Sequence, residues 1–111
     1  MPITPVTDRF AVSPQITPAD LTAIAQAGFR AIICNRPDHE GPDQPDFAAI
    51  EAAARAAGLQ ARHIPVVPGQ ITEAHGQAMR AALAELPGPV LAYCRSGARS
   101  TSLWQLAQSL G

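Results

Sequence analysis

The sequence predicts one α/β domain over residues 1–111, with a short, mostly parallel central sheet and helices on both faces. Short apolar runs alternate along the chain with segments that place apolar residues every three or four positions. Glycine and proline stand at the joints between these segments, where they end helices and form turns. Strands that alternate with helices favour a parallel sheet covered on both sides. A chain of 111 residues that is 47% hydrophobic suffices for one core.

The first half of the chain is expected to alternate strand and helix. Thr17 is a favourable helix cap, Pro18 suits the first helical position, and Asp20 stands three residues after the cap. Gly28 ends this helix, since glycine commonly follows a helix C-terminus. The other expected segments are a strand at residues 9–12, a buried strand at 29–34, a polar loop at 35–44 and a helix at 45–57.

The second half continues the alternation and ends with a loop that leads into a helix. In open α/β sheets, reactive groups gather at the carboxyl ends of the strands. Cys34, the segment after Val67, and Cys94 all stand at such ends. The expected segments are a strand at residues 59–67, a turn at 68–69, a helix at about 72–86, a strand at 90–93, a loop at 94–99 and a helix at 100–110 capped by Ser100 or Thr101.

Composition narrows the class of function. The net charge is −1, which favours neither a nucleic acid nor a membrane as partner. Two cysteines are too few for a disulfide framework, and the three histidines have no metal-site spacing. The N-terminal residues do not have the pattern of a secretion signal. We therefore expect a cytoplasmic protein that uses no metal and no cofactor.

The segment V-L-A-Y-C-R-S-G-A-R-S-T-S, residues 90–102, carries the chemistry. A buried strand delivers Cys94 into a tight loop that opens onto a helix, so backbone N–H groups and the helix N-terminus form an anion cradle. Gly97 permits the positive φ that closing the cradle needs. Arg95 and Arg99 add positive charge. A free thiol has a pKa of roughly 8.5, which such surroundings lower to about 3.5–7.5. The alternative is an ordinary buried core cysteine.

The six residues Cys94-Arg95-Ser96-Gly97-Ala98-Arg99 resemble the active loop of rhodaneses, Cys-Arg-X-Gly-X-Arg/Thr. Residues 31–38 (A-I-I-C-N-R-P-D) and 57–66 (A-G-L-Q-A-R-H-I-P-V) resemble dual-specificity phosphatases, and specifically the beta-lactamase-hydrolase-like phosphatase-like domains. Members of that family occur alone or beside metallo-β-lactamase-type hydrolases such as persulfide dioxygenases. The resemblance implies a phosphatase-like fold with abbreviated C-terminal helices and such a hydrolase as partner.

The resemblance also implies roles for single residues. Cys94 is then the nucleophile and Arg99 the anion-binding arginine. Ser100 matches the hydroxyl residue that assists departure of the thiolate in phosphatases. The substrate anion is held by the loop residues Arg95, Ser96, Gly97 and Ala98.

The chain departs from the phosphatase pattern in three ways, and two of them, the shorter loop and the missing acid, favour sulfur transfer. Four residues separate Cys94 from Arg99 where phosphatases have five, and Tyr93 stands where they usually have histidine. The segment of residues 66–72 has no carboxylate to protonate a leaving alkoxide. Our first hypothesis is a rhodanese-like sulfurtransferase that forms a persulfide on Cys94 and passes sulfur to a thiol or cyanide. The second is a phosphatase with a phosphocysteine, and the third is a non-catalytic anion or sulfur carrier for a partner hydrolase.

Other polar residues are assigned to the rim of this site. Arg36 contacts either the substrate or a neighbouring acid, Asp38 or Glu40. Asp38 is an alternative proton donor for a phosphatase; its loop also contains Glu40, Asp43 and Asp46, and a solvated polar loop is the simpler interpretation. Cys34 is either a resolving thiol for Cys94 or a buried strand residue. The substrate is a small sulfur-containing or phosphorylated molecule.

Overall fold

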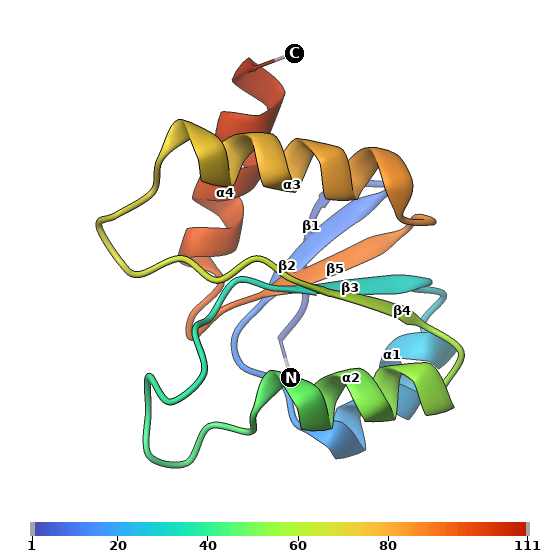
Figure 1. Cartoon of the computed structure of the whole chain (residues 1–111). Coiled ribbons are helices and arrows are strands. Elements are labelled where there is room, and N and C mark those ends of the chain that lie inside the picture. The colour runs from blue at the N-terminus through green and yellow to red at the C-terminus, as the bar shows by residue number, and fades with distance from the viewer. Residues whose placement is uncertain (1, 111) are drawn as a thin grey trace.

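Four parallel strands end along the same edge of a five-stranded sheet, which brings distant polar segments together. A computed structural model describes residues 2–110 and has the strand order β1-β2-β5-β3-β4 (Figure 1). β2, β5, β3 and β4 are parallel, and β1 pairs with β2 in the antiparallel direction. The strands are β1 (Thr4–Thr7), β2 (Phe10–Ser13), β3 (Ala31–Cys34), β4 (Gln60–His63) and β5 (Val90–Tyr93).

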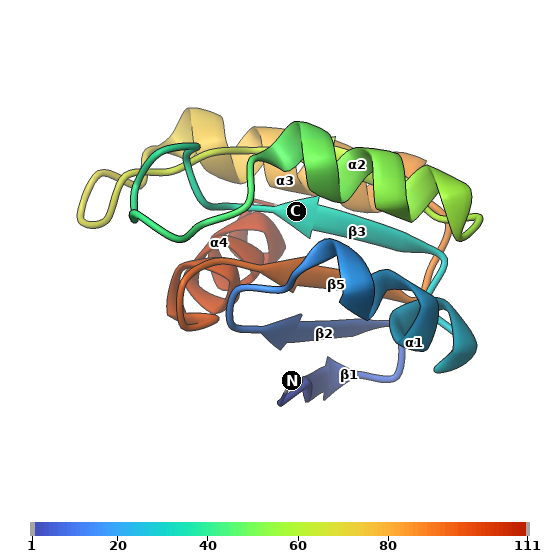
Figure 2. The same cartoon turned by 90° about the horizontal axis from the view of Figure 1, so that it is seen from below.

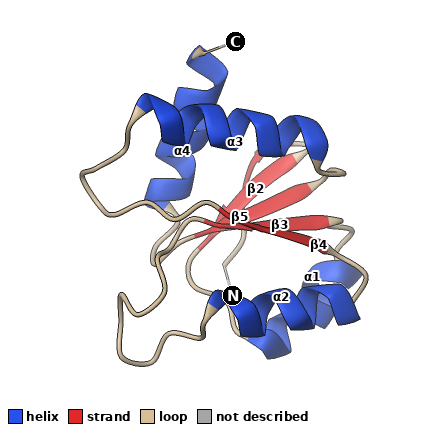
Figure 3. Ribbon diagram, in the orientation of Figure 1, coloured by secondary structure: helices blue, strands red, loops and turns tan. Residues whose placement is uncertain are grey.

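Helices cover both faces of the sheet, as predicted. Figures 1 and 2 show α1 and α2 on one face and α3 and α4 on the other, and Figure 3 shows the same layers by type of structure. The helices are η1 (Pro18–Asp20, a 3-10 turn), α1 (Leu21–Gln26), α2 (Phe47–Ala56), α3 (Glu73–Glu85) and α4 (Ala98–Ser109). The predicted α/β architecture is therefore confirmed.

The side chains of the central strands divide the core into two layers because successive strand residues point to opposite faces. Ile33 of β3 packs with Met79 and Leu103 from the α3 and α4 side. Ile32, next to it in sequence, packs with Ile24 and Ile50 from the α1 and α2 side. All six of these side chains are fully buried.

The structure differs from the predicted strands at β1 and at β4. β1 was not predicted, because Pro5 breaks the apolar pattern; an edge strand tolerates a proline that donates no ladder hydrogen bond. The strand predicted at residues 59–67 is confined to β4, Gln60–His63. The chain beyond it leaves the sheet, and the backbone N–H of Val66 bonds to the carbonyl of Asn35 instead of to a neighbouring strand.

The prediction that the last helix begins at Ser100 was also wrong. α4 begins at Ala98, and its cap is Gly97 with φ +95°, a left-handed conformation that glycine adopts at little cost. Neither Ser100 nor Thr101 caps the helix. The early start places Arg99 and Ser100 in the first helical turn, where backbone N–H groups have no partner within the helix.

Candidate active site

The sulfur of Cys94 lies where β5 passes into α4, and backbone N–H groups converge on it. Gly97 donates its N–H to Cys94 Sγ at 3.0 Å. The N–H groups of Ser96, Arg99 and Ser100 act on the same sulfur. Two of these four donors belong to the first turn of α4, which explains why the helix has to begin as early as Ala98. Backbone N–H groups thus converge as predicted, and they are directed at the sulfur of Cys94 itself.

These donors favour the thiolate form of Cys94. Burial raises the pKa of the thiol, since the residue is only 1% exposed, but the backbone N–H groups of Ser100, Ser96, Gly97 and Arg99 together lower the pKa below its ordinary value. A hydrogen bond to the charged form stabilises that form. The structure thus agrees with the prediction of an acidic thiol at residue 94.

One predicted member of the cradle has another partner. The N–H of Ala98 donates to the Oγ of Ser96 at 3.3 Å, and its predicted contact with a substrate anion stays a prediction. The hydroxyl of Thr101 bonds to the carbonyl of Gly97 at 3.0 Å and fixes the start of α4. These two hydroxyl groups therefore stabilise the shape of the loop and of the helix start.

Arg99 joins Cys94 to a carboxylate from another loop. Its two Nη atoms donate to both oxygens of Glu40, at 2.8 and 2.7 Å, and Nη1 also donates to the carbonyl of Val66 at 2.9 Å. The hydrogen bonds to Glu40 are the main reason that the pKa of Arg99 is raised, and Cys94 makes a smaller contribution in the same direction. The guanidinium thus lies between the nucleophile and Glu40.

Glu40 holds a second arginine as well. Arg36 donates from Nε to Glu40 Oε1 at 2.9 Å and from Nη1 to the side-chain oxygen of Gln15 at 3.0 Å. The hydrogen bond from Arg99 lowers the pKa of Glu40, and Arg36 lowers it further. Glu40 is therefore an ionised acceptor at neutral pH. The predicted pairing of Arg36 with an acid of its own loop is confirmed, with Glu40 as that acid.

Asp38 makes a structural contact with α2, and its role as an alternative acid stays a prediction. Its Oδ1 accepts the backbone N–H of Phe47 at 2.8 Å, at the first residue of α2. Negative charge is favourable at a helix N-terminus, and the N–H satisfied here has no partner within the helix. Both candidate acids thus bind other groups of the protein: Asp38 binds the start of α2, and Glu40 binds two arginines.

Cys34 and Ser100 are buried close to this network. Burial raises the pKa of the Cys34 thiol, and the thiol donates to the carbonyl of Arg36 at 3.3 Å. Both cysteines are free thiols, so a resolving role for Cys34 stays a prediction. Ser100 is fully buried, and its Oγ has no hydrogen-bond partner among residues 2–110. That hydroxyl is free to interact with a ligand or with the sulfur.

Two site residues were not singled out from the sequence. Glu40 was noted only as one acid among several in a polar loop. Asn35 is fully buried and donates from Nδ2 to the carbonyl of Ile64 at 3.1 Å, while its N–H bonds to the carbonyl of Tyr93 at 2.8 Å. Asn35 therefore connects the ends of β3, β4 and β5. A polar residue directly after a buried strand is the only sequence signal that points to it.

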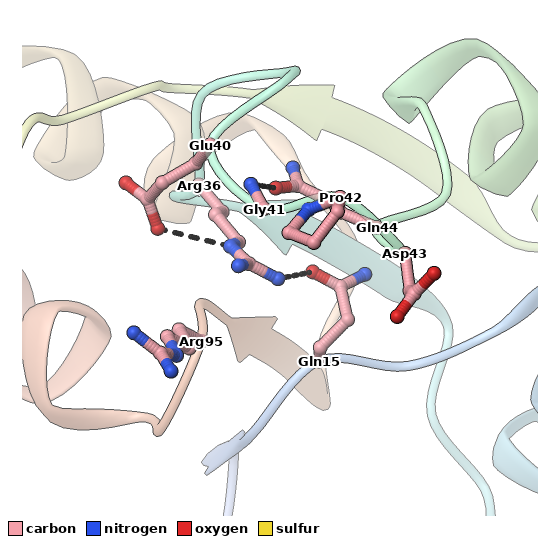
Figure 4. A pocket seen from close by; sticks show the side chains of 8 residues that line it. All are labelled: Gln15, Arg36, Glu40, Gly41, Pro42, Asp43, Gln44 and Arg95. Atoms are coloured by element: carbon pink, nitrogen blue, oxygen red, sulfur yellow. Dashed lines mark hydrogen bonds and ion pairs between the residues drawn. The ribbon is translucent and has the colours of Figure 1, made fainter.

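A cavity of about 300 Å³ adjoins the catalytic loop (Figure 4). Arg95 contributes to its wall from the Cys94 loop, and the Arg36–Glu40 ion pair contributes from the loop after β3. Figure 4 shows Arg95 at one end of the group and Asp43 at the other. The cavity is lined by Gln15, Arg36, Glu40, Gly41, Pro42, Asp43, Gln44 and Arg95.

Comparison with known proteins assigns the chain to a family. Residues 3–111 match the family described as "Beta-lactamase hydrolase-like protein, phosphatase-like domain". The chain belongs to this family. A curated relative, the beta-lactamase hydrolase-like protein of Xylella fastidiosa strain Temecula1, is 42% identical over 108 residues, which are 97% of this chain and 25% of the relative. The chain thus spans about a quarter of the length of the curated relatives it matches.

Solved structures of phosphatase-like proteins share the fold. A Neisseria meningitidis protein described as a candidate phosphatase superposes with a TM-score of 0.90 at 40% identity, over 98% of this chain and 78% of the other. The core catalytic domain of the S. cerevisiae PP-IP phosphatase SIW14 has a TM-score of 0.74 at 13% identity, over 97% of this chain and 65% of that domain. The second likeness concerns the fold alone. The phosphatase-like fold inferred from the sequence is confirmed.

Two further findings concern the part of the chain that the structure describes. No helix in residues 2–110 combines the length and the apolar character that crossing a membrane requires. Within the same residues, no three histidine, cysteine or acidic side chains gather in a way that could hold a metal ion. A cytoplasmic location stays a prediction.

Proposed function

We propose that this domain is a cysteine-dependent hydrolase of the phosphatase type, which acts on phosphoryl compounds with good leaving groups through a phosphocysteine at Cys94. The family and the structural relatives name phosphatases, which supports the second of the three sequence hypotheses over the first. The observation that carries the proposal is the thiol of Cys94, its pKa lowered by four backbone N–H groups of the adjoining helix start. A stabilised thiolate beside anion-binding amides provides both a nucleophile and a site for developing charge.

The acids near the site restrict the leaving group. Glu40 is ionised and holds two arginines, and Asp38 caps α2. A basic alkoxide needs a proton as it departs, whereas a phenolate or a phosphate can leave as an anion. We therefore propose aryl phosphates or phosphoanhydrides as the substrate class.

The reaction needs two displacements at phosphorus. The thiolate of Cys94 attacks phosphorus, the P–O bond breaks, and the oxygen of the leaving group takes the electron pair. Water then attacks the phosphocysteine, the S–P bond breaks, and the sulfur takes the electron pair, which restores the thiolate. One proton of the water stays on the released phosphate and the other passes to solvent. In this proposal Ser100 donates to the departing sulfur; its hydroxyl is buried in the first turn of α4 and has no partner among residues 2–110, which supports the role.

Hydrolysis of p-nitrophenyl phosphate and of glycerol phosphate tests this proposal. We expect turnover of the aryl ester alone, and we expect Cys94→Ser to lower kcat by about a thousandfold or more, as removal of a nucleophile does. Cys34→Ser is the matched control, since it changes the other buried cysteine. Equal turnover of both esters would contradict the restriction on leaving groups, and full activity of Cys94→Ser would contradict the proposal itself.

Sulfur transfer is the second candidate, and the engagement of both nearby acids favours it. Asp38 accepts the first N–H of α2, and Glu40 holds two arginines. Sulfite or a thiolate departs as an anion without a proton, so sulfur transfer needs neither acid. The loop is also one residue shorter than in phosphatases, which leaves a smaller cradle.

In the sulfur reaction, the thiolate of Cys94 attacks the outer sulfur of thiosulfate, the S–S bond breaks, and sulfite leaves with the electron pair. Cyanide or a thiolate then attacks the terminal sulfur of the persulfide and restores Cys94. Formation of thiocyanate from thiosulfate and cyanide measures this activity. If it depends on Cys94 while p-nitrophenyl phosphate is untouched, the second candidate replaces the first. If neither reaction occurs, the carrier hypothesis remains, with a metallo-β-lactamase-type hydrolase as the proposed partner.

A further inference from the structure

The cavity beside the catalytic loop presents two unpaired charges of opposite sign. Among residues 2–110, neither Arg95 nor Asp43 makes a side-chain hydrogen bond or ion pair, and both are exposed. Figure 4 shows them at opposite ends of the lining residues, with Arg36 and Gln15 between them. The two charges therefore face a shared space without neutralising each other.

The other polar groups of the cavity are already satisfied. Gln15 accepts from Arg36 and donates to the carbonyl of Ile16 at 2.8 Å. Gln44 accepts the N–H of Gly41 at 3.1 Å and donates to the carbonyl of Pro37 at 2.8 Å. These bonds hold the walls in place before a ligand arrives, which lowers the entropic cost of binding.

The position of the cavity relates it to the nucleophile. Arg95 follows Cys94 directly, and its carbonyl accepts the N–H of Gln15 at 3.3 Å, which ties the loop to the cavity wall. Glu40 lines the cavity and binds Arg99. When a phosphoryl group lies at Cys94, the leaving group that departs from its phosphorus has this cavity beside the loop available to it. A volume of about 300 Å³ suits a small molecule and is at the lower end of the usual range for ligand sites.

We propose that this cavity binds the leaving group of the substrate and selects an amino-acid-like zwitterion, with Arg95 bound to its carboxylate and Asp43 to its ammonium group. The inference rests on the proposed function, because it says which leaving group the same reaction prefers. An arginine fork matches a carboxylate in geometry, and a carboxylate is the natural partner of an ammonium ion. A singly charged leaving group would use only one end of the cavity.

Three substrates with one phenolic leaving atom test the proposal: O-phospho-L-tyrosine, its N-acetyl derivative and its carboxamide. We expect kcat/KM for phosphotyrosine to exceed that for each derivative by roughly three- to tenfold, the effect of one partly exposed charged contact. Arg95→Gln should remove the preference for the acid over the carboxamide. Asp43→Asn should remove the preference for the free amine over the N-acetyl form. Arg80→Gln, an exposed arginine on α3, is the matched control and should keep both preferences.

Equal kcat/KM for the three substrates, or preferences that persist in Arg95→Gln and Asp43→Asn, would overturn the inference. If no phosphate ester is hydrolysed, the proposed function fails, and binding then decides the inference separately. O-phospho-L-tyrosine is titrated into the Cys94→Ser protein while the amide resonances of Gly41 and Gln44 are followed by NMR. Shifts at these amides that weaken with the N-acetyl derivative support the cavity, and their absence refutes it.

Discussion

Replacing Glu40 by glutamine should destabilise the protein. Glu40 accepts three charged hydrogen bonds, of 2.7 and 2.8 Å from Arg99 and 2.9 Å from Arg36. A glutamine side chain has one acceptor oxygen and an NH₂ group, so at least one arginine N–H loses its partner. The side chains of Arg36 and Arg99 are only 8% and 11% exposed, so water replaces that partner poorly.

The magnitude follows from these contacts. Loss of one charged hydrogen bond at a partly buried site costs about 2 kcal/mol of the free energy of unfolding. For a domain of this size, that corresponds to a fall of about 8 °C in Tm. Thermal unfolding at pH 7 measures the effect. Glu51→Gln is the matched control, because Glu51 pairs with Arg55 on the exposed side of α2 and should contribute less than about 0.5 kcal/mol.

The pH dependence gives a second check on Glu40. Arg99 lowers the pKa of Glu40 in the folded state. Its contribution to stability is therefore fully present above the pKa of the unfolded carboxyl, about 4.3, and is lost as the pH falls through the folded pKa. The difference in stability between the natural protein and Glu40→Gln should shrink on acidification. A difference that is absent at pH 7, or that does not shrink, would refute the assignment of Glu40 as the anchor of both arginines.

Two more variants, and pH titrations of Cys94, test the Cys94 loop and the polar segment after β3. Gly97→Ala should lower stability by roughly 1 kcal/mol or more, because φ +95° is strained for alanine, and should reduce turnover more than a distant substitution of equal cost. Asp38→Asn should lower the free energy of unfolding by about 1 kcal/mol, because it weakens the contact of residue 38 with the N-terminus of α2, and it should leave the pH profile of kcat unchanged. Loss of one limb of that profile would identify Asp38 as the acid. The ultraviolet absorbance of the Cys94 thiolate should titrate below about pH 8.5, the ordinary pKa of a thiol, with Cys94→Ser as the blank. Because this pKa is lowered, the stability that Cys94 provides over Cys94→Ser should be complete above about pH 8.5 and disappear as the pH falls through the folded pKa; a difference that grows on acidification would contradict the sign of the shift.

The order of elements could be predicted because it depends on local patterns. Apolar periodicity, with glycine and proline at the joints, indicated β3, α2, α3 and β5 close to their observed bounds. The loop of Cys94 was likewise visible, since a strand, a cysteine, a glycine and a helix start follow one another within a few residues. β1 was missed because pairing at the edge of a sheet depends on the strand beside it and not on its own sequence.

By itself, the sequence determined that a cysteine follows a buried strand in a glycine-containing loop, and hence that a thiolate site exists in an α/β domain. The tertiary structure alone decided which acid meets which arginine. Glu40 and Arg99 are 59 residues apart, and they meet because parallel strands bring their carboxyl ends to one edge of the sheet. The same packing directed Asp38 to α2 and joined Arg95 to Asp43 across one cavity. Contacts between loops depend on the register of the strands that carry them, and no pattern within either loop specifies that register.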